Sequence, residues 1–143
     1  MKPAKFKRDS LIEQAMLAFS RHPSIMVNFY ANNLWGQLSR HPDAKKDPKF
    51  LAVVPKWLEV ACKKLVKVGH PSKRDSPACA FSQLDFETDE EFVSQFGKSR
   101  IIMLDTVKTL SSIDPSVSYQ IADTWLRNLL SQQNIATKDQ VDR

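Results

Sequence analysis

Apolar residues recur three and four positions apart along most of the chain, which is the spacing of side chains on one face of an α-helix. Ile12, Met16 and Phe19 belong to one such stripe. The next contains Val27, Tyr30, Leu34 and Leu38. We expect each stripe to be buried against neighbouring helices. The same spacing predicts five helices, at about residues 10–20, 24–40, 48–68, 89–113 and 115–133.

Prolines mark most of the predicted helix boundaries. The three histidines all precede a proline, and because that position is disfavoured in a helix, each His-Pro pair is expected to end one. Asp47-Pro48 and Asp114-Pro115 predict helix starts instead, since the carboxylate can cap the helix and the proline suits its first turn. Residues 88–91, Thr-Asp-Glu-Glu, form a capping-box pattern. Pro55, inside the third helix, predicts a kink or a restart.

The segment 69–87 shows neither helical nor strand periodicity and contains Pro71 and Pro77. It therefore predicts a long loop between the third and fourth helices. Loops of that length inside a compact domain are uncommon and are often functional or disordered.

The pattern predicts an all-α fold in which residues 1–143 form a single segment of antiparallel helical hairpins. The three glycines argue against a sandwich or barrel, because such folds need turn residues every few positions. HEAT units of an α-solenoid contain about 40–47 residues, which agrees with two helices per unit here. No clean internal sequence repeat is visible, which weakens this interpretation but does not reverse it.

Enzyme chemistry is not expected. No nucleophile elbow, glycine-rich phosphate loop or catalytic triad can be assembled, and each histidine is tied to a helix-ending proline. No cofactor and no metal are expected, because Cys62 and Cys79 lack zinc-site spacing and the acidic run lacks the spacing of a calcium loop. No apolar run approaches the length that spans a bilayer, so membrane insertion is not expected.

Two charged features remain, in a chain of net charge +5. Lys49, Lys56 and Lys63 recur every seven residues opposite the apolar stripe of the third predicted helix, with Lys64 beside them and Lys67 one turn farther on. These lysines could face phosphates, or they could form a solvated face in which Glu59 pairs with Lys63. The second feature runs from Lys73-Arg74 to an acidic cluster, which could simply complement a helix dipole.

Several stretches resemble, in order and spacing, an internal segment of an exportin of the karyopherin-β (importin-β) family. They are RHPS, LWGQLSRH, DPKFLAVVPKWL, LVKVGHPSKRDSPAC, DFETDEEF and DPSVSYQIADTWL. The resemblance covers about residues 19–130, and the fourth and fifth stretches are its most specific parts. It implies a fragment of a HEAT-repeat nuclear export receptor that shuttles between nucleus and cytoplasm. The implied partners are Ran-GTP, double-stranded RNA such as precursor microRNA hairpins and, for the full-length protein, nucleoporins.

The resemblance also assigns roles to the charged residues. The third predicted helix would line the concave surface, where phosphates and 2′-hydroxyls of double-stranded RNA can be held by point charges. The implied RNA contacts are Lys49, Lys56, Lys63, Lys64, Lys67, Lys73 and Arg74. The implied Ran contacts are the acidic residues Asp85, Glu87, Asp89, Glu90 and Glu91. The alternative is a HEAT-repeat adaptor that binds proteins and no RNA.

Overall fold

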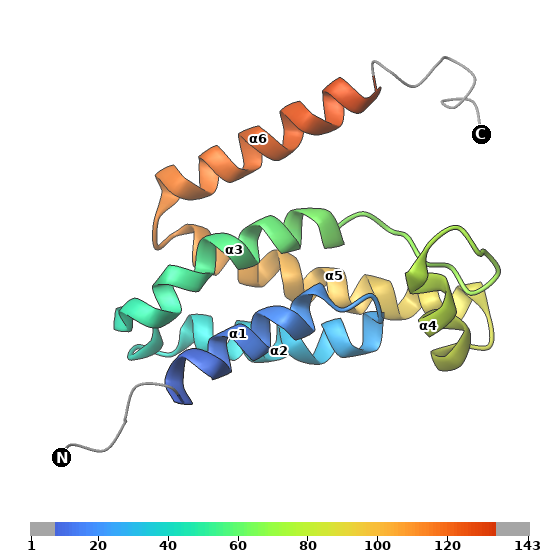
Figure 1. Cartoon of the computed structure of the whole chain (residues 1–143), viewed down its shortest axis with the longest axis horizontal. Helices are drawn as coiled ribbons and strands as arrows, with labels where there is room; N and C mark the ends of the chain where they lie inside the picture. Colours follow the sequence, from blue (N-terminus) through green and yellow to red (C-terminus); the bar gives the residue numbers. More distant parts are fainter. Residues whose placement is uncertain (1–7, 134–143) are drawn as a thin grey trace.

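The computed structural model describes residues 8–133, and within that range it contains helices and no strands, which confirms the all-α class (Figure 1). A short 3-10 helix, η1 (Ala44–Lys46), lies between the second and third α-helices. The α-helices are α1 (Arg8–Arg21), α2 (Ile25–Arg40), α3 (Pro48–Lys64), α4 (Pro77–Asp85), α5 (Asp89–Ser111) and α6 (Pro115–Gln133).

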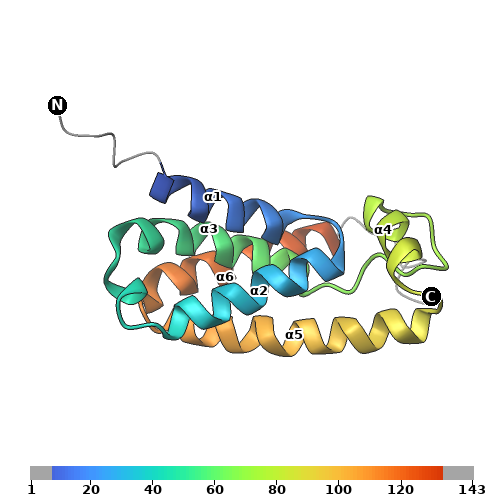
Figure 2. The ribbon, with the colours of Figure 1, turned by 90° about the horizontal axis from the view of Figure 1, so that it is seen from below.

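The five long helices form two layers. α3 packs between α1 and α6 in one layer, and α2 packs along α5 in the other (Figures 1 and 2). Consecutive long helices therefore alternate between the layers, as the helices of stacked αα-hairpins do. The short helix α4 lies at a corner of the molecule, beside the first turns of α5 (Figure 2).

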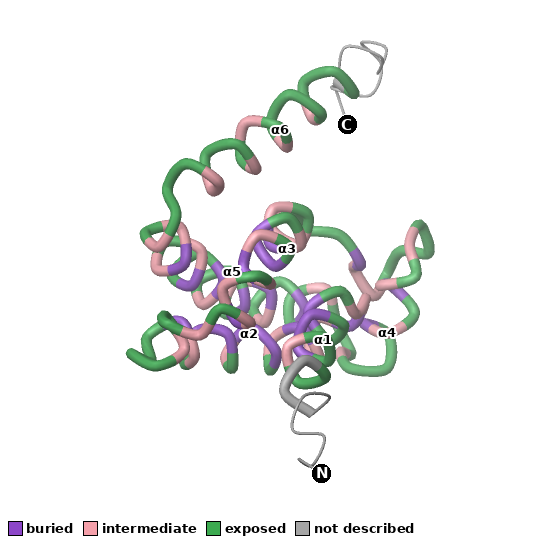
Figure 3. Tube along the Cα trace, turned by 60° about the vertical axis from the view of Figure 1, so that its left-hand side comes forward, coloured by how far each residue is buried: buried purple, intermediate pink, exposed green. Residues whose placement is uncertain are grey.

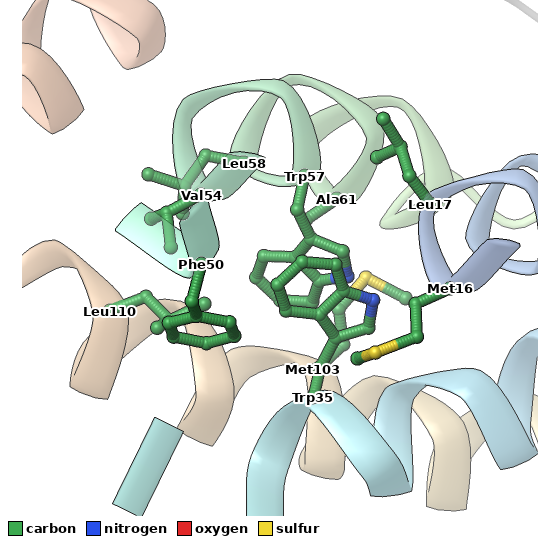
Figure 4. Close-up of a cluster of buried hydrophobic side chains, with 10 residues drawn as sticks. All are labelled: Met16, Leu17, Trp35, Phe50, Val54, Trp57, Leu58, Ala61, Met103 and Leu110. Carbon is green, nitrogen blue, oxygen red and sulfur yellow. The ribbon is translucent and has the colours of Figure 1, made fainter. Parts of the chain in front are cut away.

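The core lies between the layers and is built around two tryptophans (Figure 4). Trp35 of α2 and Trp57 of α3 are almost completely buried, with ring centroids 5.6 Å apart. The indole N–H of Trp35 donates to Ser20 Oγ of α1 at 3.0 Å, so its one polar atom is satisfied. The remaining buried side chains of the cluster are Met16, Leu17, Phe50, Val54, Leu58, Ala61, Met103 and Leu110.

The predicted caps hold the starts of three helices. Asp47 accepts from the Lys49 amide at 2.9 Å, and Asp114 accepts from the Val117 amide at 3.1 Å. Thr88 accepts from the Glu91 amide at 3.2 Å, as the capping-box pattern predicts. The Glu91 carboxylate, however, accepts from the amide of Glu87 and not from that of Thr88.

Two predictions about the middle of the chain are wrong. The segment 69–87 is not a continuous loop, because α4 occupies Pro77–Asp85 with Pro77 in its first turn. The third helix does not reach residue 68: it ends at Lys64, and the chain from Val66 to His70 is non-helical. α3 passes through Pro55 without a restart, so the proline costs a backbone hydrogen bond but does not divide the helix.

The buried faces of α1 and α2 also differ from the predicted stripes (Figure 3). Ile12 is 60% exposed, Phe19 56% and Tyr30 67%. α2 instead buries a face that is mostly small or polar, because it packs closely on α5. A Cβ atom added to Gly36 would lie only 3.1 Å from Thr106 Oγ1. The residues of this buried face are Asn28, Ala31, Asn32, Trp35, Gly36 and Ser39.

Candidate binding surfaces

The lysine row predicted on the third helix is only partly assembled. Lys56 and Lys63 are exposed on α3, opposite the face that contributes Phe50, Trp57 and other core residues. Lys49 lies half-buried at the start of the same helix. Glu59 and Lys63 form no ion pair with each other, so Glu59 does not neutralise the charge of Lys63. α3 therefore presents at least two accessible positive charges on its outer face.

Lys64 points away from this exposed row. Its ammonium donates to the carbonyl oxygen of His22, at the start of the α1–α2 turn, over 2.6 Å. Burial lowers the pKa of this ammonium, because the charged form loses hydration. Lys64 thus ties the end of α3 to the α1–α2 turn.

The other predicted basic candidates lie outside α3. The sequence places Lys67 one helical turn beyond Lys63, but the helix ends before it, and Lys67 lies exposed in the non-helical link. Lys73 and Arg74 are exposed in the turn that precedes α4. The backbone carbonyl of Lys73 accepts from Gln83 of α4 at 3.3 Å, which holds this turn against the helix. The seven candidates therefore lie on α3, in the link that follows it and in the turn before α4, and they do not form one stripe.

The five acidic candidates do come together. They line an open hollow with a volume of about 1080 Å³ between α4 and the start of α5, at the corner of the molecule seen in Figure 1. No lysine or arginine is among the residues that line it. The acidic members of the lining are Asp85, Glu87, Asp89, Glu90 and Glu91.

Some of these carboxylates are engaged within the fold. Asp89 accepts two hydrogen bonds from Ser72, one from its amide at 3.0 Å and one from its hydroxyl at 2.5 Å. The bond from the Ser72 hydroxyl is the main reason why the pKa of Asp89 is lowered. Asp85 accepts from the Ser24 hydroxyl at 3.2 Å. The exposed carboxylates of Glu87 and Glu90 make no hydrogen bond or ion pair within the part of the chain that the structure describes.

Sequence reasoning missed Arg100, which comes from α5 and lines a small hollow together with Lys63 and Lys64. No local sequence signal predicts that Arg100 lies near Lys63 and Lys64. Helical periodicity assigns a residue to a face of its helix, but it does not identify the helix against which that face packs.

Residues 8–133 contain neither a metal site nor a membrane-spanning helix. Among the described side chains of that range, no group of three or more His, Cys, Asp or Glu is placed to hold a metal ion. None of the helices in that range is both long and apolar enough to cross a membrane.

The comparisons with known proteins agree on one family. A family model described as the Exportin-5 family matches residues 10–140. Exportin-5 of Mus musculus is 42% identical to this chain and exportin-5 of Homo sapiens 40%, each over 118 residues that make up 82% of the chain and 10% of the relative. Exportin-5 of Dictyostelium discoideum is 28% identical over 121 residues, again 82% of the chain and 10% of the relative.

The chain thus spans about a tenth of the length of these curated relatives. The family model nevertheless covers every helix from α2 to α6 and nearly all of α1. These matches show that the chain belongs to the exportin-5 family.

Proposed function

We propose that this chain is one segment of a nuclear export receptor and that the outer face of α3 contacts double-stranded RNA cargo. The observation that supports this most directly is the exposure of Lys56 and Lys63 on one face of a helix, where no described carboxylate pairs with Lys63. Double-stranded RNA offers regularly spaced phosphates, which exposed ammonium groups can neutralise without reading the sequence. Lys49, Lys67, Lys73 and Arg74 are further candidates for such contacts, whereas Lys64 acts within the fold.

We assign the acidic hollow at the α4–α5 corner to Ran-GTP. Five carboxylates with no basic residue in the same lining produce a negative potential, which suits a basic protein surface. Glu87 and Glu90 are the residues to test, because Asp85 and Asp89 already accept hydrogen bonds that hold the fold. For the full-length receptor we also propose three properties: export activity, shuttling between nucleus and cytoplasm, and contact with nucleoporins.

The RNA proposal is tested in the full-length receptor with a short RNA hairpin and Ran-GTP. We expect Lys56→Glu with Lys63→Glu to weaken binding and to reduce the slope of log affinity against log salt by about one for each lysine. The matched control is Lys98→Glu with Lys108→Glu, which makes the same charge change on α5. An unchanged affinity and salt slope in the α3 variant would instead favour an adaptor that binds proteins and no RNA.

The Ran proposal has its own test. Glu87→Gln with Glu90→Gln is expected to weaken Ran-GTP binding in the absence of RNA, as measured by isothermal titration calorimetry. Asp43→Asn with Glu59→Gln removes the same charge from exposed positions outside the hollow and should leave Ran affinity unchanged. Equal Ran affinity in the two double variants would leave the acidic residues with a structural role only.

A further inference from the structure

A second, smaller hollow lies where the start of α2, the end of α3 and the middle of α5 meet. Its volume is about 60 Å³, and no acidic residue is among those that line it. The lining is mostly basic and apolar, and Asn28 and Ser99 are its neutral polar members. The basic residues are Lys63, Lys64 and Arg100, and Ile25, Val66, Val68, Phe96 and Met103 are among the apolar ones.

The three basic residues have no counterion among the described side chains. None of them forms an ion pair with another side chain of residues 11–133. Lys64 is half-buried and donates one hydrogen bond, to a neutral carbonyl. A partly buried ammonium loses hydration, and no carboxylate compensates for that loss at Lys64. The same loss of hydration lowers the pKa of Lys64. An incoming anionic group would therefore gain more here than at a fully solvated lysine.

The apolar lining restricts what that anionic group can be attached to. Val66 is 46% exposed and Val68 56%, although both are aliphatic residues beside a hollow. A water molecule occupies about 30 Å³ of liquid, so the hollow has room for about two waters or one small aliphatic group. A nucleobase is too large for it, and a bare phosphate would gain nothing from valines.

We propose that this hollow is a docking site for a short acidic segment of a partner protein. One aliphatic side chain of the segment would rest on Val66 and Val68, and carboxylates on either side of it would pair with Lys64 and Arg100. The site is distinct from the RNA and Ran surfaces proposed above, although Lys63 borders both this hollow and the outer face of α3. Burial of one aliphatic group provides selectivity, and the charged rim provides attraction.

The test uses the full 143-residue chain and a fluorescein-labelled peptide of sequence Asp-Glu-Leu-Glu-Asp, followed by fluorescence anisotropy. A second peptide carries Ser in place of Leu and keeps the same charge. We expect the chain to bind the Leu peptide about tenfold more tightly than the Ser peptide, as for an aliphatic group in an apolar pocket. Arg100→Glu is expected to weaken both peptides, and Val68→Ser to remove the preference for Leu. Lys98→Glu, on α5 but outside the lining, is the charge control.

Three results would overturn the proposal. The first is no binding of the Leu peptide by the unmodified chain, and the second is equal affinity for the Leu and Ser peptides. The third is tighter binding of a heptauridylate that Arg100→Glu abolishes, because the hollow would then be a phosphate site. Arg100, Val68 and Lys98 are all exposed, so these variants should keep the far-ultraviolet circular dichroism of the unmodified chain. The RNA proposal is tested separately at Lys56, which is not among the residues that line this hollow.

Discussion

At the scale of single residues, several charged side chains that the sequence offers for partner contacts also make contacts within the fold. Lys64 and Asp89 were both sequence candidates for partner contacts, yet one binds the His22 carbonyl and the other binds Ser72. Asp89 also lies 3.9 Å from the imidazole Nδ1 of His70. These contacts join residues 17 to 42 positions apart in the chain, and for that reason residue spacing does not reveal them.

The bond between Asp89 and Ser72 predicts a particular pH dependence. The pKa of Asp89 is lowered below its ordinary value of 3.8, so its carboxylate stabilises the folded chain above that pH. This contribution should disappear as the pH falls through the lowered folded-state pKa. We expect Asp89→Asn to lower the free energy of unfolding at pH 7 and to have no effect well below pH 3.8. Urea denaturation at pH 7 and at a pH well below 3.8 measures the difference in the free energy of unfolding between Asp89→Asn and the unmodified chain.

Ser72→Ala provides the control for this prediction. It removes the hydroxyl that donates to Asp89 but keeps the carboxylate. It should reproduce part of the loss at pH 7. A difference between Asp89→Asn and the unmodified chain that stays constant down to the lowest pH would contradict the assignment.

At the scale of elements, the sequence was informative about most helices but not about α4. The rule that places a helix start at Asp47-Pro48 also applies to Ser76-Pro77, where α4 begins. The helix was overlooked because it has only nine residues, too few for its apolar spacing to be distinguished from a loop. The early end of α3 is missed by the sequence pattern for a different reason: Leu65 and Val68 continue the apolar spacing beyond Lys64, although Val68 is exposed.

Two glycines offer a matched test of how α2 and α5 pack. Nothing lies within 4 Å of a Cβ atom built at Gly97 of α5, whereas one built at Gly36 of α2 lies 3.1 Å from the buried Thr106 hydroxyl. Gly97→Ala should therefore stabilise the chain by about 0.5–1 kcal/mol through helix propensity. Gly36→Ala should destabilise it by about 1 kcal/mol or more, because Thr106 is fully buried and already donates to Ile102.

Chemical denaturation of the two variants under identical conditions separates these effects. The ordering of the midpoints should be Gly97→Ala, then the unmodified chain, then Gly36→Ala. A stabilising effect of both substitutions would show that α2 and α5 have room between them. That result would contradict the close packing that defines the second layer.

At the scale of the whole molecule, the outermost helices of the first layer carry apolar faces that this chain leaves uncovered. On α6, Val117, Ile121 and Trp125 line the groove toward α3, and a different face of the same helix is also apolar. Arrays of helical hairpins bury such faces against the next repeat. The exposed apolar residues are Leu11, Ile12 and Phe19 on α1, and Tyr119, Leu126 and Leu130 on α6.

These faces predict that the 143-residue chain self-associates. Sedimentation velocity at increasing protein concentration should show dimers or larger species, because association removes the exposed apolar area from water. Phe19→Glu with Leu126→Glu should shift the chain toward monomer, and Lys98→Glu should leave the distribution unchanged. A chain that remains monomeric at the highest concentration would contradict this expectation.

The central claim is that the outer face of α3 lies against the RNA cargo. Photocrosslinking tests it directly, with a benzophenone amino acid in place of Lys56 in the full-length receptor and, as control, in place of Lys108 of α5. In the presence of Ran-GTP and a short RNA hairpin, we predict a crosslink to RNA from position 56 and none from position 108. No crosslink from position 56, or equal crosslinking from both positions, would contradict the claim.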